Sequence, residues 1–125
     1  MNVVATDAAP KAIGPYCQAI CQEGLVYCSG QIPLDPTSMQ VVPGGIEAQT
    51  EQVLKNVGAV LKAAGSDLSK ELKTTVFLRN LADFAKMNGI YERAFSGHTP
   101  ARSTVEVARL PLDVLIEIEC IAALS

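Results

Sequence analysis

The spacing of apolar residues in this chain changes between the period of a helix and the period of a strand. In the segment that begins at Ile46, apolar residues recur at intervals of three and four, which predicts an amphipathic helix. Gly65 stands where a left-handed glycine commonly ends a helix. A second helical stripe covers residues 81–95, with Asn80 placed to cap it and Asp83 in its first turn. The two stripes consist of Val53, Leu54, Val57, Val60, Leu61 and Ala64, and of Leu81, Phe84, Met87, Tyr91, Ala94 and Phe95.

Five segments around these helices have the composition and alternation of β-strands. Glu23-Gly24 joins the first two as a predicted hairpin turn, and residues 110–113 join the last two. The order strand-strand-helix-strand-helix-strand-strand predicts an α+β fold in which both helices cover one face of a mixed sheet. Residues 1–125 fit a single domain. The predicted strands are residues 16–22, 25–30, 72–78, 103–109 and 114–123.

The sheet face that the helices leave uncovered is predicted to be mixed in character. Successive side chains of a strand point to opposite faces, so each strand can be divided into two sets. A face that combines large apolar side chains with acids and one arginine favours a subunit interface containing a polar pocket. The residues assigned to this open face are Phe77, Arg102, Thr104, Glu106, Leu115, Glu117, Glu119 and Ile121.

The balance of apolar and charged residues also favours association. Apolar residues make up 49% of the chain and charged residues 18%, whereas ordinary soluble domains have about 25% charged residues. A net charge of −3 without a run of basic residues argues against nucleic-acid binding, which needs clustered cations. No apolar run approaches the roughly 20 residues that span a bilayer. The N-terminal residues have no signal-peptide or transit-peptide pattern, so we expect a cytoplasmic protein with no membrane partner.

The sequence has no recognisable metal or cofactor motif. Its four cysteines do not form two ligand pairs at the spacing of a zinc site. We interpret them as reduced, buried side chains. No phosphate-binding loop, dinucleotide-binding glycine pattern, zincin motif or nucleophile elbow occurs. We therefore expect neither a metal nor an organic cofactor. The cysteines are Cys17, Cys21, Cys28 and Cys120.

Arg102 and a pair of acids are the strongest candidates for chemistry. Arg102 follows a loop that Pro100 stiffens, and an arginine held in this way suits a bidentate contact with a carboxylate or phosphate. The alternative is a surface ion pair with Glu106 or another acid. Glu117 and Glu119 form either a solvated edge or a pair in which one acid is partly buried with a raised pKa.

Two further polar residues are weaker candidates for a functional role. His98, the single histidine, lies in a predicted loop without an evident partner, and we interpret it as solvated. Asn88 interrupts the apolar stripe of the second helix, as a ligand contact or as an ordinary polar residue of the helix face. The residues by themselves predict a small, interface-forming α+β domain with an anion-binding arginine.

Six short motifs, in order along nearly the whole chain, resemble the signature blocks of one family. This is the Rid/YjgF family of reactive-intermediate imine deaminases, also known as endoribonuclease L-PSP or translation-inhibitor proteins. The motifs are Ala12-Ile13-Gly14-Pro15-Tyr16, Ser29-Gly30-Gln31-Ile32-Pro33, Lys73-Thr74-Thr75-Val76-Phe77, Pro100-Ala101-Arg102-Ser103, Val105-Glu106-Val107-Ala108-Arg109-Leu110-Pro111 and Ile116-Glu117-Ile118-Glu119.

The resemblance implies a chorismate-mutase-like fold that assembles as a homotrimer, with three clefts between subunits. It implies hydrolysis of small imine and enamine carboxylates, 2-aminoacrylate and 2-iminobutanoate, to 2-oxo acids and ammonia without a cofactor. By motif position, Arg102 resembles the arginine that clamps the substrate carboxylate. Glu117 resembles the acid that positions or protonates at the reacting water. The positions that resemble cleft-lining residues are Tyr16, Ser29, Gly30 and Asn88.

The chain departs from the family pattern in two places. Thr104 stands where the family often has a cysteine whose backbone carbonyl holds the water, and we predict it as a further substrate contact. The loop before Pro100 is shorter than in some relatives, which would change the rim of the cleft.

Two other functions stay open from the sequence. A single-strand endoribonuclease or translation inhibitor is disfavoured by the net charge and by the lack of aromatic residues interleaved with cations. A non-catalytic trimer that binds small ligands or acts like a chaperone would share the same fold.

Overall fold

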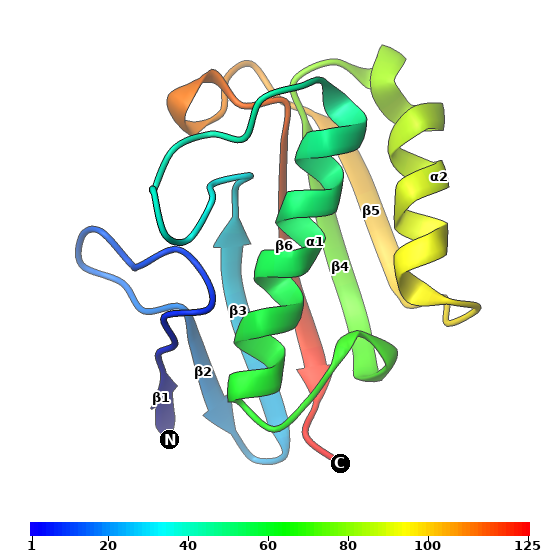
Figure 1. Cartoon of the computed structure of the whole chain (residues 1–125). Coiled ribbons are helices and arrows are strands. Elements are labelled where there is room, and N and C mark those ends of the chain that lie inside the picture. The colour runs from blue at the N-terminus through cyan, green and yellow to red at the C-terminus, as the bar shows by residue number, and fades with distance from the viewer.

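Two helices lie across one face of a six-stranded mixed sheet in the computed structural model, which describes residues 1–125 (Figure 1). The strands are β1 (Asn2–Val4), β2 (Ala19–Gln22), β3 (Leu25–Gln31), β4 (Glu71–Leu78), β5 (Ala101–Glu106) and β6 (Ile116–Ala123). The helices are α1 (Ile46–Ala63) and α2 (Phe84–Phe95), with short 3-10 helices η1 (Leu68–Lys70), η2 (Leu81–Asp83) and η3 (Pro111–Asp113). The strand order is β1-β2-β3-β6-β4-β5, and the β4–β5 pair is parallel. The predicted α+β architecture is confirmed.

Helix α1 has the bounds that its apolar stripe predicts. It begins at Ile46 after the N-cap residue Gly45, and its last turn passes into Ala64. Gly65 then adopts a φ of 89°, the left-handed conformation that costs a glycine little. The N–H of Ser66 donates to the carbonyl of Leu61 at 2.8 Å, which satisfies one of the open carbonyls at the helix end.

Buried polar side chains of α1 attach two irregular segments to the helix. Asn56 is 1% exposed, and its Nδ2 donates to the carbonyls of Ile32 at 3.1 Å and Leu34 at 2.9 Å. Gln49 accepts a 2.8 Å hydrogen bond from the N–H of Leu115 through Oε1. These bonds hold the segments after β3 and before β6 against the helix.

The hydrophobic core lies between the helices and one face of the sheet. It is a single cluster of 21 buried residues, and complete burial of a large aliphatic side chain contributes about 1.5–3 kcal/mol. This packing fixes both helices relative to the central strands. Prominent members are Val26, Val76, Leu78, Ile116 and Ile118 from the sheet, with Val53, Val57, Leu61, Met87 and Ile90 from the helices.

The strand β1 was not predicted, and the next strand is shorter than predicted. Three residues of β1 pair antiparallel with β2, too few for an alternation to be recognised. The segment between the two strands is held by Gln18, which is 4% exposed. Its Oε1 accepts from the N–H of Thr6 at 2.7 Å, and its Nε2 donates to the carbonyl of Pro10 at 2.8 Å. The Gln18 side chain is thus bonded to this segment, and the regular sheet pairing of β2 begins at Ala19.

The predicted bounds of the last two strands are also wrong. The strand β5 begins before residue 103 and ends at Glu106. The connection to β6 contains η3, where Leu112 and Asp113 both have a φ of 55°. Positive φ at two successive residues breaks the extended conformation, so β6 starts only at Ile116.

Asn80 is a helix cap, as predicted, but it caps η2 and not α2. Its Oδ1 accepts a 2.9 Å hydrogen bond from the N–H of Ala82. The helix α2 begins three residues later than the predicted stripe, at Phe84. Leu81 therefore lies outside α2 and is 45% exposed, and Phe84 is 39% exposed.

The prediction that Arg102, Thr104 and Glu106 lie on the open face of the sheet is wrong. They pair in register with Thr74, Val76 and Leu78 of β4, whose side chains are buried on the helix-covered face. The alternation within a strand defines two sets of side chains, but the register with the neighbouring strand decides which face each set takes.

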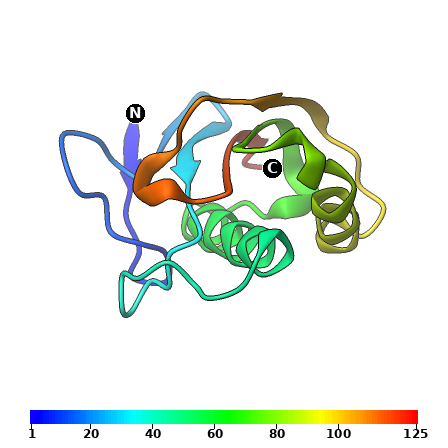
Figure 2. The same ribbon diagram turned by 90° about the horizontal axis from the view of Figure 1, so that it is seen from above.

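The open face carries the other set of each strand. Figure 2 shows both helices on the same side of the sheet. Glu117 of β6 pairs with Phe77 of β4, which pairs with Val105 of β5, so these three side chains share the uncovered face. Tyr27 on β3 belongs to it and is 44% exposed, and Val105 is 42% exposed. This chain supplies no element that covers these apolar side chains.

Candidate active site

The side chain of Arg102 projects from β5 toward α2 and is held there by neutral groups. Its Nη1 donates to Oδ1 of Asn88 at 2.8 Å. The guanidinium carbon lies 4.8 Å from the centroid of the Tyr91 ring and 5.6 Å from that of Phe84. Both are cation–π distances. Asn88, which the family resemblance implies as a cleft-lining residue, therefore contacts Arg102.

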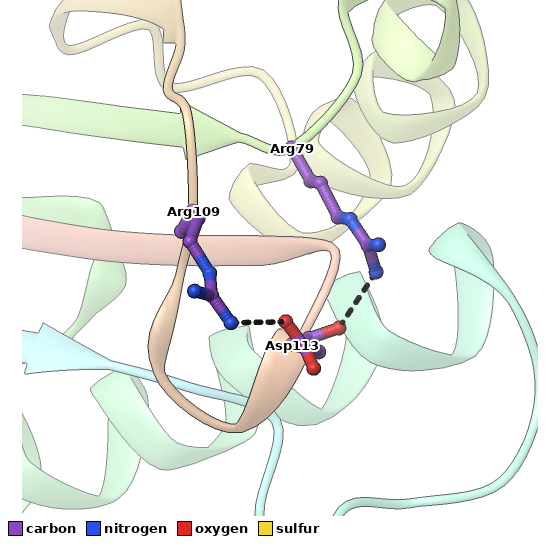
Figure 3. Close-up of polar contacts among 3 residues, drawn as sticks. All are labelled: Arg79, Arg109 and Asp113. Carbon is purple, nitrogen blue, oxygen red and sulfur yellow. Dashed lines mark hydrogen bonds and ion pairs between the residues drawn. The ribbon is translucent and has the colours of Figure 1, made fainter.

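The charge of Arg102 is not neutralised within the chain. The predicted alternative, an ion pair with Glu106, is wrong, because the Oε1 of Glu106 accepts from the N–H of Leu81 at 2.9 Å. The single ion pair of the chain joins Arg109 to Asp113 at 3.8 Å, in the exposed segment before β6 (Figure 3). The same figure shows a second arginine at this residue: Arg79 donates to the backbone carbonyl of Asp113 at 3.2 Å. Among the arginines, Arg102 thus combines a fixed position with an unpaired charge.

Arg102 lines a hollow with a volume of about 760 Å³. The hollow lies between the C-terminal half of α2 and the loop that leads into β5. It is lined by Asn88, Tyr91, Glu92, Gly97, His98, Thr99, Pro100 and Arg102. An unpaired guanidinium in a polar hollow can bind a small carboxylate or phosphate.

The interpretation of His98 as a solvated loop residue is wrong. The ring is half-buried, and Nε2–H donates to the backbone carbonyl of Glu71 at 2.7 Å. This bond attaches the loop to the beginning of β4, so His98 shapes the hollow.

A second group of predicted residues gathers on the open face and at the end of β3. Gly30 lies against the carboxylate of Glu117, and a Cβ at Gly30 would collide with it. Burial raises the pKa of the Glu117 carboxyl, and the nearby charge of Glu119 raises it further. The alternative of a fully solvated acidic edge is therefore wrong for Glu117, while Glu119 is exposed.

Ser29 and Tyr16 lie beside Gly30. The hydroxyl of Ser29 donates to the carbonyl of Cys17 at 2.7 Å, which ties β3 to the chain before β2. The side chain of Tyr16 is 55% exposed. Tyr16 and Gly30 line the same hollow of about 440 Å³, together with Leu112 of η3.

The seven predicted residues therefore fall into two groups on opposite faces of the sheet. The Arg102 group contains Arg102, Asn88 and Thr104, and the Glu117 group contains Glu117, Gly30, Ser29 and Tyr16. The Oγ1 of Thr104 is buried without a hydrogen-bond partner, and Thr104 does not line the Arg102 hollow. Within one chain, the Arg102 and Glu117 groups do not meet.

Sequence reasoning placed Phe84 and Tyr91 in the core stripe of α2 and missed their contact with Arg102. The available signal is the helical spacing of Phe84, Asn88 and Tyr91, which puts all three on one face of α2. An asparagine between two aromatic residues on one face is a pattern that could hold a cation.

Other side-chain clusters do not form a metal centre. No group of three or more histidine, cysteine, aspartate or glutamate side chains has the arrangement to hold a metal ion. The four cysteines are unpaired, with Cys28 and Cys120 buried. Neither helix has the length and apolarity needed to cross a membrane.

Comparison with known proteins gives a consistent result. The sequence profile of the family described as Endoribonuclease L-PSP matches residues 6–124. A RutC family protein of Pyrococcus horikoshii is 52% identical over 97% of this chain and 96% of its own length. A 2-iminobutanoate/2-iminopropanoate deaminase of Mus musculus is 49% identical over 97% of this chain and 90% of its own.

A solved structure agrees with the sequence matches. The crystal structure of E. coli TdcF with bound serine is 42% identical, covers 100% of both chains and superposes with a TM-score of 0.95. Together with the profile match along almost the whole length, these similarities show that the chain belongs to the endoribonuclease L-PSP family, the Rid/YjgF proteins.

Proposed function

We propose that this protein is a hydrolytic deaminase of reactive enamine and imine carboxylates, such as 2-aminoacrylate and 2-iminobutanoate, and that it releases 2-oxo acids and ammonia. The observation that carries the proposal is the unpaired guanidinium of Arg102, held at a polar hollow by neutral contacts. Relatives named as imine deaminases at about 50% identity support the same reaction. The bound serine of TdcF is a small amino carboxylate, which fits this substrate class.

The proposed active unit is a chorismate-mutase-like homotrimer whose sites lie between subunits. The Arg102 group of one subunit would face the Glu117 group of the next. Two features support this assembly: the groups lie on opposite faces of one sheet, and the open face carries half-exposed apolar side chains such as Tyr27 and Val105. Burial of these side chains against a second copy would stabilise the assembly.

In the proposed reaction, Arg102 binds the substrate carboxylate. Asn88 takes one N–H of Nη1, and the remaining N–H groups of the guanidinium can form a bidentate contact. Fixing the substrate in this way removes much of the entropic cost of bringing the reacting carbon and water together. The Thr104 hydroxyl, which is buried without a partner, would contribute a further contact to the substrate.

Glu117 is the proposed proton carrier. Water adds to the imine carbon, and one of its protons passes through the Glu117 carboxyl to the imine nitrogen. The second proton then moves from the new hydroxyl group to the amino group, the C–N bond breaks, and ammonia leaves as the 2-oxo acid forms. A carboxyl whose pKa is raised by burial suits this exchange near neutral pH. Tyr16, Ser29 and Gly30 would line the same side of the site. Gly30 leaves room for the carboxylate. No step requires a metal or an organic cofactor.

The decisive measurement is the rate of 2-oxobutanoate release from freshly generated 2-iminobutanoate, with and without the protein. Arg102→Ala should lose nearly all of the acceleration. Arg93→Ala, an exposed arginine on the same helix as Asn88, should keep it. A folded wild-type protein that does not exceed the buffer rate would refute the deaminase. Carboxylate binding without turnover would instead indicate a non-catalytic ligand-binding protein.

A further inference from the structure

Arg102 is held in place without a charged partner, by residues of α2 that β4 in turn supports. An arginine that binds a free anion must point in one direction, although its side chain has several rotatable bonds. A carboxylate partner would orient it but would also occupy its charge. In this chain, all the groups that hold the Arg102 guanidinium are uncharged: an amide oxygen and two aromatic rings.

Tyr91 makes the closer of the two aromatic contacts, and its own position is fixed. The side chain is 7% exposed. Its hydroxyl forms a buried 2.7 Å hydrogen bond with the hydroxyl of Thr74. Its ring lies against that of Phe95, with centroids 4.4 Å apart and a tilt of 32°.

Thr74 connects this ring to the strand that bears the arginine. Thr74 of β4 is the register partner of Arg102 on β5. Two residues that are neighbours across the strands therefore contact the same side chain on α2. Thr74 bonds to the hydroxyl of Tyr91, and Arg102 contacts its ring. The ring cannot shift over the guanidinium without breaking a buried hydrogen bond or separating α2 from the sheet.

We infer that Tyr91 is a positioning residue for carboxylate binding through its ring, to which the hydroxyl bond with Thr74 adds a smaller restraint. The Tyr91 ring orients the guanidinium of Arg102 toward the hollow while leaving its charge available to the ligand. This inference rests on the proposed function for its kinetic readout, but its binding readout requires only that Arg102 holds a carboxylate.

The test compares three substitutions. Tyr91→Leu removes the ring, Tyr91→Phe keeps the ring and removes the hydroxyl, and Phe84→Leu removes the more distant and more exposed ring. The Kd for 2-oxobutanoate is measured by calorimetry, and KM and kcat are measured with 2-iminobutanoate. Thermal unfolding identifies any variant that does not fold.

Tyr91→Leu should raise Kd and KM about tenfold or more with a much smaller change in kcat, because the arginine contributes to binding in both ground and transition states. Tyr91→Phe should restore binding to within about threefold of wild type, because it keeps the cation–π contact. Phe84→Leu, at the surface of α2, should raise Kd and KM two- to threefold, and it provides the same readout if Tyr91→Leu does not fold.

The outcomes separate this inference from the proposed function. The positioning role is overturned if a folded Tyr91→Leu protein has a Kd within experimental error of wild type while Arg102→Ala abolishes binding; if Tyr91→Leu does not fold, the same result for Phe84→Leu overturns the positioning of Arg102 by aromatic rings. It is also overturned if Tyr91→Phe binds as weakly as Tyr91→Leu, since the ring would then contribute nothing. Wild-type protein that binds 2-oxobutanoate but does not hydrolyse the imine refutes the deaminase and leaves the positioning role supported. Wild-type protein that binds no carboxylate refutes both.

Discussion

Arg102 and Glu117 extend from opposite faces of the same β-sheet. Arg102 pairs in register with Thr74 of β4, which pairs with Cys120 of β6, and all three lie on the helix-covered face. Glu117 pairs with Phe77 of β4, which pairs with Val105 of β5, and these three lie on the open face. A reaction that needs both side chains at one substrate therefore needs two copies of the chain. This relationship makes the proposed assembly testable through the two residues themselves.

Mixing two inactive variants should restore activity. If each site takes Arg102 from one subunit and Glu117 from the next, a trimer that contains both Arg102→Ala and Glu117→Gln chains has intact sites at some of its interfaces. With equal amounts and random assembly, about one quarter of the sites are intact. The measurement is the imine-hydrolysis rate after the mixed variants are unfolded and refolded together, with each variant refolded alone as the control. No recovery in refolded trimers would mean that the two groups do not meet across subunits.

Gly30→Ala should reduce turnover at least tenfold with little loss of stability. The new Cβ would collide with the end of the Glu117 side chain, which is flexible enough to move aside. The fold is then preserved while the carboxylate leaves its position, and misplacement of a reacting group is costly to the rate. The measurements are kcat and the midpoint of thermal unfolding. Gly89→Ala is the matched control, because a Cβ there meets nothing within 4 Å. Equal activity of the two variants would contradict a role for the Gly30–Glu117 contact.

Glu119→Gln should move the pH profile of kcat/KM to lower pH. Burial raises the pKa of Glu117, and the charge of Glu119 raises it further. Removal of that charge lowers the pKa of Glu117, so the limb of the profile that Glu117 controls shifts downward whether Glu117 acts as acid or base. Glu51→Gln changes an exposed acid on α1 and should leave the profile in place. An upward shift, or identical profiles for both variants, would show that Glu117 does not control the rate.

Glu71 should make the protein less stable as the pH rises through neutrality. Its side chain is 1% exposed, neither carboxyl oxygen has a hydrogen-bond partner, and burial raises its pKa from 4.5 to about 7. Because the folded state holds the proton more tightly than the unfolded state, the contribution is fully present below about pH 4.5. It is lost between there and pH 7, and the loss amounts to about 3 kcal/mol.

Glu71→Gln cannot ionise and should lose this dependence. Urea unfolding at pH 5 and pH 8 measures the difference in the free energy of unfolding between the variant and wild type. The variant should gain on wild type by about 2–3 kcal/mol between the two pH values, whereas Glu51→Gln should keep nearly the same difference at both. If the free energies of unfolding of Glu71→Gln and wild type differ by the same amount at both pH values, Glu71 is already ionised in the folded protein at pH 5.

Local patterns were sufficient to predict the helices and most of the strands. The spacing of Val53, Val57 and Leu61 determines the buried face of α1, and Gly65 determines its end, because both depend only on near neighbours. The three-residue strand β1 could not be predicted in this way. It is too short to show a period, and the segment that follows it is held by Gln18, a residue 12 positions from its partner Thr6.

The sequence by itself determined which residue types are present for the chemistry and, through six motifs, the family to which they belong. Only the tertiary structure decided which of these residues lie on each face of the sheet. The faces taken by Arg102 and Glu117 follow from strand register, and register depends on pairing between segments far apart in the chain. The same holds for Glu71, whose position at the start of a strand carries no sign of burial, because burial depends on the layers that close over it. Tyr91, predicted as a core residue, contacts the arginine because β4, β5 and α2 bring Thr74 and Arg102 to the same ring.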